Sequence, residues 1–361
     1  MSENSSNSRP ARTEPSLKQW EALYEVAENL KKLAPWRALR DTDILTLLLP
    51  GQDEPVYCSV MGQGDTTYGI SIYPGHEAFL RLMRIVEHDG HSPELLMLEQ
   101  KCLICNFGDR DEIAPEDRAV MKQLGLKFRG HNQWIYFRAM EPGQFPWFLD
   151  AEQAELMIAA LQNLTMLCLR YLEGKLTVDF DAGQTLNRWY DPEKDMWFNA
   201  VIPMVRPKLK RTLELEDELL SARLKRCKKT DARLEMDAFY IPVPVQEDKK
   251  SPPVGVHLAL IADKNTGLIA KCKIAEQEEP ECVIAPALLI EYILECGRPS
   301  VVYVRNEWIG STLRNLCKAV GVRLVEDEGV PLLDELPFER LLLGNGSLDG
   351  VWMDDDDDDF E

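Results

Sequence analysis

Long apolar runs are missing from this 361-residue sequence. The longest candidate, Ala154 to Leu172, is interrupted by charged side chains such as Glu155 and Arg170, whereas a membrane-spanning helix needs roughly 18 consecutive apolar residues. No apolar segment near the N-terminus has the pattern of an export signal. The sequence therefore predicts a cytoplasmic protein without a membrane partner.

Basic residues are in deficit, with 41 Lys and Arg against 61 Asp and Glu, so the formal net charge is −20. A chain of this charge repels phosphate backbones, and a nucleic-acid partner would require its basic residues to gather in one patch. The basic stretch Arg223–Lys229 has no interleaved aromatic residues on which bases could stack. We therefore expect an unidentified protein partner, with a basic surface as the natural complement.

Nucleophilic motifs are also scarce. There are five histidines and no Gly-x-Ser-x-Gly elbow. The nine cysteines are odd in number and lie mostly among apolar residues, which is typical of reduced thiols rather than a disulfide framework. His131 lies in a polar loop that could line a pocket or form a surface turn. These observations favour a non-catalytic protein, although they leave the question of an enzyme open.

Length and pattern predict a mixed α/β (α+β) protein of two domains, each with a mixed β-sheet and flanking helices. The expected parts are a disordered tail (1–16), an N-terminal α/β domain (17–205), a charged helical connector (206–235), a C-terminal α/β domain (236–345) and an acidic disordered tail (346–361). The tail ends in Asp354–Asp359, and its expected target is a basic surface such as the connector.

The element order in both domains reads as three strands, a helix, a strand, a helix and a strand. In the first domain the helix signals are Pro115 with Gly125 at its end, and Asp150 with Gln153 as a capping box. In the second domain the first strand is expected at Phe239–Val245. The shared order suggests a diverged duplication, without sequence identity to support it.

One candidate metal site consists of His88, His91, Cys102 and Cys105, because two His and two Cys ligands could close a tetrahedral zinc site. If Cys102–Cys105 lies in a strand, however, residues three apart point to opposite faces and cannot share a metal. The alternative is two small core residues and two histidines at the surface. No cofactor is predicted, and zinc is retained as a minor hypothesis.

A second candidate is a carboxylate cluster in the C-terminal domain, where Asp263, Glu291 and Glu307 are the possible catalytic residues. Two-metal nucleases hold Mg²⁺ on clustered carboxylates that clamp the attacking and leaving oxygens. Here Arg305–Asn306 stands where an aspartate is expected after a strand, and the expected first strand has no carboxylate. The required ligand set is therefore incomplete.

Several motifs resemble a bacterial two-domain family of unknown function. They are Ala34–Leu39, Val56–Gly62, Tyr68–Gly75, Phe128–Gly130 and Pro142–Pro146. The resemblance covers most of residues 17–345 and implies a bacterial cytoplasmic protein, but no reaction. The C-terminal domain, in its order of elements, resembles a degenerate ribonuclease H-like or integrase-core fold. Three hypotheses follow: an interaction or regulatory protein, a nucleic-acid-associated protein or metal-dependent nuclease, and a zinc-stabilised module.

Overall fold

The chain separates into two compact units in a computed structural model that describes residues 12–65, 67–88, 90–208, 217–246, 248–275, 279, 282–326 and 329–334. Among the described residues, those between 12 and 87 and between 99 and 208 form the first unit, and those from 217 onward belong to the second. The short segment 88–98 belongs to the second unit, although the sequence placed it inside the first domain. The expected acidic tail lies outside the described residues.

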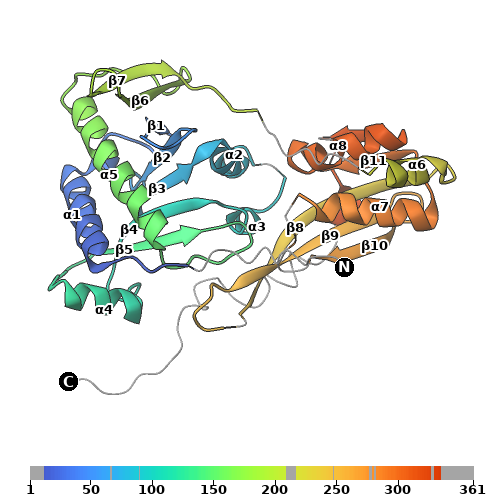
Figure 1. Cartoon of the computed structure of the whole chain (residues 1–361), viewed down its shortest axis with the longest axis horizontal. Coiled ribbons are helices and arrows are strands. Elements are labelled where there is room, and N and C mark those ends of the chain that lie inside the picture. The colour runs from blue at the N-terminus through green and yellow to red at the C-terminus, as the bar shows by residue number, and fades with distance from the viewer. Residues whose placement is uncertain are drawn as a thin grey trace. The chain divides into compact units, whose positions relative to one another are not determined.

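A seven-stranded mixed sheet forms the first unit, in the order β5-β4-β3-β2-β1-β6-β7 (Figure 1). Neighbouring strands run antiparallel except β1 and β6, which are parallel. The strands are β1 (Leu45–Leu48), β2 (Val56–Met61), β3 (Tyr68–Pro74), β4 (Cys102–Gly108), β5 (Trp134–Met140), β6 (Gln184–Asp191) and β7 (Met196–Pro203).

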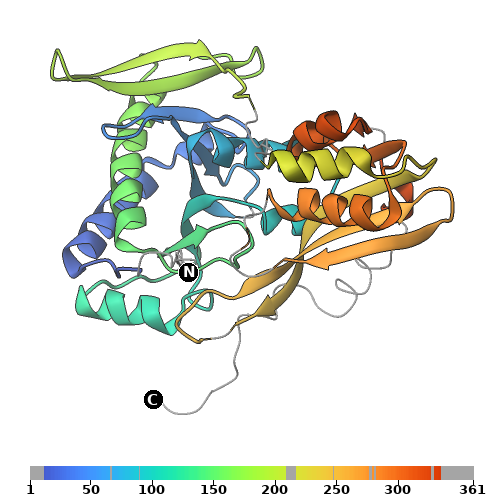
Figure 2. The same ribbon diagram turned by 45° about the vertical axis from the view of Figure 1, so that its right-hand side comes forward.

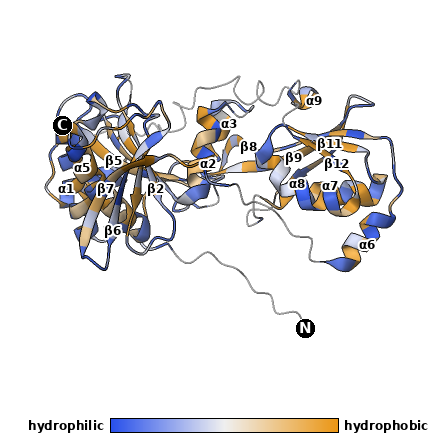
Figure 3. Ribbon diagram, turned by 90° about the horizontal axis from the view of Figure 1, so that it is seen from above, coloured by the Kyte–Doolittle hydropathy of each residue, from blue (hydrophilic) through white to orange (hydrophobic). Residues whose placement is uncertain are grey.

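Helices cover both faces of this sheet. On one face lie α1 (Leu17–Leu33), α4 (Pro115–Gln123) and α5 (Ala151–Leu172), whose apolar residues share a core with the strands. On the other face α2 (Gly75–Val86) packs through Ala78 and Phe79. The short helix η1 (Pro35–Arg37) follows α1. Figure 3 shows hydrophobic residues concentrated along the central strands of this sheet.

Local signals set several helix boundaries as expected. The Asp150 side chain accepts a hydrogen bond from the Gln153 N–H at 2.8 Å, so the predicted capping box is present at the start of α5. Pro115 occupies the first turn of α4, and Gly125 follows the helix with φ of 68°, a conformation that glycine adopts without strain.

A five-stranded sheet forms the second unit, in the order β10-β9-β8-β11-β12. Strands β8, β11 and β12 are mutually parallel, and β9 is antiparallel to β8 and β10. The elements are α3 (Pro93–Met97), α6 (Glu218–Arg226), β8 (Arg233–Val245), β9 (Val254–Asp263), β10 (Leu268–Ile274), α7 (Ile284–Cys296), β11 (Val301–Val304), α8 (Glu307–Val320), β12 (Arg323–Glu326) and α9 (Pro331–Asp334).

Different helices pack on the two faces of this second sheet. Helices α6, α7 and α8 pack against one another, and α7 and α8 pack on the strands (Figure 1). On the opposite face, Leu95 from α3 and Leu333 from α9 pack on Leu258 and Leu260 of β9. The segment 88–98 therefore closes a core that the rest of the second unit leaves open.

The prediction of a mixed α/β protein with two mixed sheets is confirmed. The sheets nevertheless differ in topology: β4 pairs with β3 at one end of the first sheet, whereas the corresponding strand β11 pairs with β8 in the middle of the second. The two units therefore share an order of elements along the chain but differ in how their strands pair. The strand pairing does not support the predicted duplication. The β6–β7 pair has no counterpart in the predicted elements.

Two further expectations change in detail. The expected connector helix is realised only as α6, and residues 209–216 lie outside the described residues. The first strand of the second sheet begins at Arg233, six residues before the expected Phe239. Within the described ranges, no helix combines the length and the apolar character needed to cross a bilayer.

Candidate functional site

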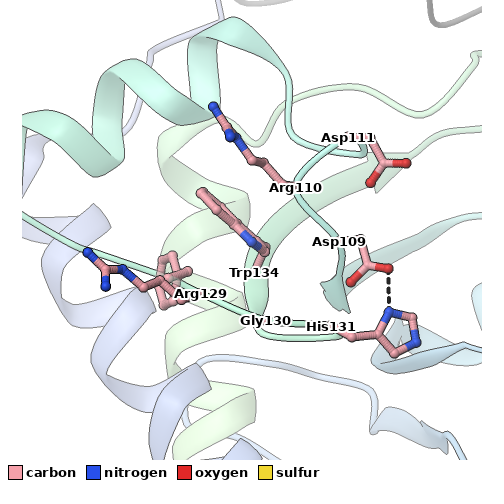
Figure 4. A pocket seen from close by; sticks show the side chains of 8 residues that line it. Asp109, Arg110, Asp111, Arg129, Gly130, His131 and Trp134 are labelled. Atoms are coloured by element: carbon pink, nitrogen blue, oxygen red, sulfur yellow. Dashed lines mark hydrogen bonds and ion pairs between the residues drawn. The ribbon is translucent and has the colours of Figure 1, made fainter.

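An open basin lies on the first unit where two loops meet. Asp109, Arg110 and Asp111 follow β4, and the loop from Phe128 to His131 precedes β5, with Trp134 as the first residue of that strand (Figure 4). The basin has a volume of about 690 Å³. Adjacent antiparallel strands β4 and β5 place the two loops side by side.

The second of these loops is held in a defined conformation. Gly130 and Asn132 have φ of 102° and 55°, and the Asn132 N–H donates to Asp109 Oδ1 at 2.7 Å. The His131 Nδ1 lies 2.5 Å from Asp109 Oδ2, as the dashed line in Figure 4 marks. The hydrogen bonds from Asn132 and His131 lower the pKa of Asp109 despite the opposing effect of desolvation.

A lysine supports the same loop from beneath. The Lys31 Nζ of α1 donates to the Asn132 carbonyl oxygen at 2.7 Å and lies 5.4 Å from the centre of the Phe107 ring. Burial lowers the pKa of Lys31 to about 8. The exposed loop is thus tied to α1 through the Asn132 main chain.

Two arginines and an aromatic pair give the basin its binding character. Arg110 and Arg129 are exposed, and no ion pair is recorded for either guanidinium among the described residues. Figure 4 shows Arg110 and Arg129 extending away from each other from the two loops that carry them, and the Trp134 ring lies 6.0 Å from that of Phe128. Guanidinium groups bind carboxylates and phosphates in a planar, bidentate manner. The lining also contains the carboxylates of Asp109 and Asp111 and the imidazole of His131.

The second unit contains a buried ion network around Asp237 of β8. This carboxylate is fully buried, and its Oδ2 lies 3.0 Å from His91 Nε2 and 2.9 Å from Arg305 Nε. Arg305, which follows β11, also donates to the Gly90 carbonyl oxygen at 2.9 Å and pairs with Asp334 at 2.6 Å. Asp237 therefore joins the segment 88–98, the end of β11 and α9.

The charge state of Asp237 reflects these partners. Burial alone would raise the pKa of Asp237, but the charges of His91 and Arg305 and their hydrogen bonds outweigh it and lower the pKa to about 2. The carboxylate is ionised at neutral pH, and the Arg305 guanidinium is its counter-ion.

Glu235 lies two residues before Asp237 on the same face of β8 and is also fully buried. Its carboxylate accepts from Lys264 Nζ at 2.5 Å and from the Leu332 N–H, at the start of α9, at 2.8 Å. The sequence argument that the first strand has no carboxylate was therefore wrong, because that strand begins at Arg233 and includes both acids. The alternation of Leu234, Glu235, Met236 and Asp237 was the signal that could have extended the strand.

Known families cover both units. Residues 20–188 match a family described as a domain of unknown function (DUF7309), and residues 220–338 match a second such family (DUF6930). Each match covers less than half of the chain, and both families are described only as domains of unknown function. No curated protein matches the chain. The two matches correspond to the first and second units, and the segment 88–98 is part of the DUF7309 sequence that packs with the DUF6930 domain.

The residues proposed for zinc are used separately. Cys102 and Cys105 lie in β4, where Cys105 packs in the core beneath α5 and Cys102 packs on the α2 face, as expected for residues three apart in a strand. Burial raises the pKa of both thiols, which disfavours the thiolate form. His91 binds Asp237, and His88 is exposed. No group of three or more His, Cys, Asp or Glu suited to a metal ion occurs among the described residues.

The three candidate catalytic acids are not brought together either. Asp263 Oδ1 accepts from the Asn265 N–H at 2.8 Å in the β9–β10 turn. Glu291 of α7 pairs with Lys273 at 3.3 Å. Glu307 begins α8, where its nearest recorded cation is Arg314 at 3.8 Å. Each acid therefore has a local structural partner.

Proposed function

We propose that the protein is a non-catalytic interaction protein whose DUF7309 domain binds an acidic segment of a protein partner in the basin around Trp134. The observation that carries the proposal is the pair of exposed arginines, Arg110 and Arg129, in the two loops that line the basin with Trp134. Two such groups offer bidentate binding to side-chain carboxylates, and the indole offers a flat apolar surface.

The shape of the basin supports a peptide as the ligand. Pockets for small molecules bury most of their ligand, whereas this basin is formed by two surface loops whose arginines and His131 are exposed. An acidic, aromatic-containing segment can lie across such a surface. The chain as a whole is acidic, so its surface outside the basin would suit a second partner that is basic.

A cytoplasmic, bacterial setting is part of the same proposal. All nine cysteines carry free thiols, which supports a reducing compartment. The motif resemblance supports a bacterial source.

Peptide binding tests the basin directly. Titration of the full chain with a blocked Asp-Asp-Asp-Phe peptide, followed by calorimetry and by the NMR signals of the indole N–H groups, should show saturable binding and a shift of the Trp134 signal. Because hydrogen bonds to charged groups contribute about 1.5–3 kcal/mol, Arg129→Gln should weaken binding about tenfold or more.

Two controls make this test specific. Arg323→Gln removes one exposed arginine of β12, outside the basin, and should leave the affinity unchanged. A Lys-Lys-Lys-Phe peptide should not bind the basin. Equal binding of both peptides, or equal loss in Arg129→Gln and Arg323→Gln, would show that general electrostatics explain the result and that the basin is not the site.

A second candidate function is a nucleic-acid-associated protein or metal-dependent nuclease on a ribonuclease H-like core. The strand order of the DUF6930 domain favours it: the central first strand β8 is flanked by the antiparallel β9 and the parallel β11. In this reading Asp237 occupies the central strand, where a metal-binding carboxylate is needed. Arg305 supplies a positive charge at that carboxylate and His91 supplies a hydrogen-bond partner, which argues for a scaffold role.

Hydrolysis assays separate the two candidates. The full chain and Asp237→Asn would be incubated with single- and double-stranded RNA and DNA in Mg²⁺ or Mn²⁺. We expect equal background rates for both proteins. Hydrolysis by the wild type that requires the metal and is lost in Asp237→Asn would favour the nuclease.

A further inference from the structure

Strand β7 forms an edge of the seven-stranded sheet. Among the described residues its only strand partner is β6, and Figure 2 shows the β6–β7 pair at the margin of the sheet. The main-chain N–H and C=O groups on the outer side of an edge strand are available to another strand, and natural proteins commonly protect such edges with charges, bulges or covering segments.

The other three sheet edges carry such protection. Strand β10 has Lys271 and Lys273 and a bulge, and β12 begins with Arg323 and ends with Glu326. Strand β5 has a short bridge between Ala139 and Trp147 on its outer side. By contrast, the seven residues from 196 to 202, Met-Trp-Phe-Asn-Ala-Val-Ile, contain no charge.

An apolar surface accompanies this uncharged segment, which ends at Pro203. The strand register places Leu48, Trp189 and Phe198 in one row across β1, β6 and β7, on the face opposite α5. The Trp189 and Phe198 rings are stacked with centres 5.5 Å apart. Leu48 is 40% exposed and Met196 is 55% exposed on the same face. Apolar rows of this kind on an edge are typical of association surfaces.

The charges at the two ends of β7 are complementary to one another. Glu193 and Asp195 lie with Lys194 in the turn before the strand, and Lys208 lies just beyond its other end, after Arg206, which pairs with Glu87. When two copies of the strand run antiparallel, the acidic turn of one lies beside the basic end of the other, and the contact occurs twice because of the two-fold symmetry. If the second copy of β7 ran parallel to the first, the two acidic turns would lie side by side, and so would the two basic ends.

We propose that β7 pairs antiparallel with β7 of a second copy of this chain, so that the two seven-stranded sheets become one continuous sheet across a two-fold axis. The pairing satisfies the outer main-chain groups of both strands, and the rows of apolar side chains around Phe198 become neighbours.

The oligomeric state tests the proposal. Sedimentation equilibrium of the full chain should give a dimer. The double variant Met196→Lys, Ile202→Lys introduces like charges at two exposed positions of the edge and should raise the dimer dissociation constant at least about hundredfold, since like charges across an interface cost several kcal/mol. The matched control Leu268→Lys, Ile274→Lys changes two exposed residues of β10 and should leave the dimer intact.

Charge exchange adds a test that does not depend on the edge itself. Glu193→Lys and Lys208→Glu should each weaken the dimer, and the two changes together should restore it, because they reverse both members of the same contact. The proposal would be overturned if the wild-type chain were a monomer, if the β7 lysines left the dimer unaffected, or if the β10 control lost it. It would also be overturned if the destabilising effects of the two charge changes were additive in the double variant.

Discussion

Replacement of Asp237 by alanine is expected to destabilise the DUF6930 domain by about 3–5 kcal/mol, the usual cost of leaving buried partner charges uncompensated. His91 and Arg305 would lose their shared anion. Urea denaturation combined with hydrogen exchange and mass spectrometry measures the effect in each unit separately. Exchange should increase most in the segment 90–98, because its polar contacts with the second unit centre on this carboxylate.

The difference in unfolding free energy between wild type and Asp237→Ala should depend on pH in one direction. The folded pKa of Asp237 is about 2, below its ordinary value of 3.8, so the carboxylate contributes stability above pH 3.8 and loses it as the pH falls toward 2. The gap between wild type and Asp237→Ala should narrow over that range. Asp334→Ala is the control, because the Asp334 side chain is 49% exposed and its loss should cost about 1 kcal/mol or less. Equal effects of the two variants would contradict the proposed network.

Glu99→Gln is expected to destabilise the DUF7309 domain by about 3 kcal/mol or more. Glu99 and Arg84 form an ion pair in which both side chains are almost fully buried, and Glu99→Gln removes this buried negative charge from beside Arg84. The Glu99 carbonyl oxygen still accepts from Arg81 at 2.7 Å, so the variant tests the charge and leaves the main-chain contact in place. Urea denaturation followed by tryptophan fluorescence measures the change.

Two comparison variants show whether the lost charge causes the destabilisation by Glu99→Gln. Glu77 pairs with Arg81 at 2.7 Å, but the Glu77 side chain is 54% exposed, so Glu77→Gln should cost less than about 1 kcal/mol. The double variant Arg84→Met, Glu99→Met removes both charges and should recover much of the loss. A double variant as unstable as Glu99→Gln would mean that packing around Glu99, and not its charge, is responsible.

These two ion networks explain how the segment 88–98 joins the other unit. Arg84 and Glu99, which flank the segment in the sequence, form an ion pair inside the first unit. Inside the second unit, His91 contacts Asp237, and the Gly90 carbonyl oxygen accepts a hydrogen bond from Arg305. Leu95 adds the apolar contact. The carboxylate that a nuclease would need for metal is thereby used to fix a piece of the DUF7309 sequence on the DUF6930 domain.

Most of the local structure could be predicted from the sequence alone. The capping box at Asp150 and the glycine after α4 depend on a few neighbouring residues, and both were placed correctly. The free thiols and the two mixed sheets also agree with composition and pattern. The β6–β7 pair was missed because its segment shows no sustained alternation of apolar and polar residues.

Only the tertiary structure decided which segments far apart in the chain meet. His91 and Asp237 are 146 residues apart, and no local pattern records that a histidine in one domain sequence has its counter-ion in the other. The basin likewise depends on β4 and β5 lying side by side, which brings Asp109 to His131. Periodicity and capping reflect interactions within a few residues, whereas ion pairs and sheet edges depend on the whole packed fold.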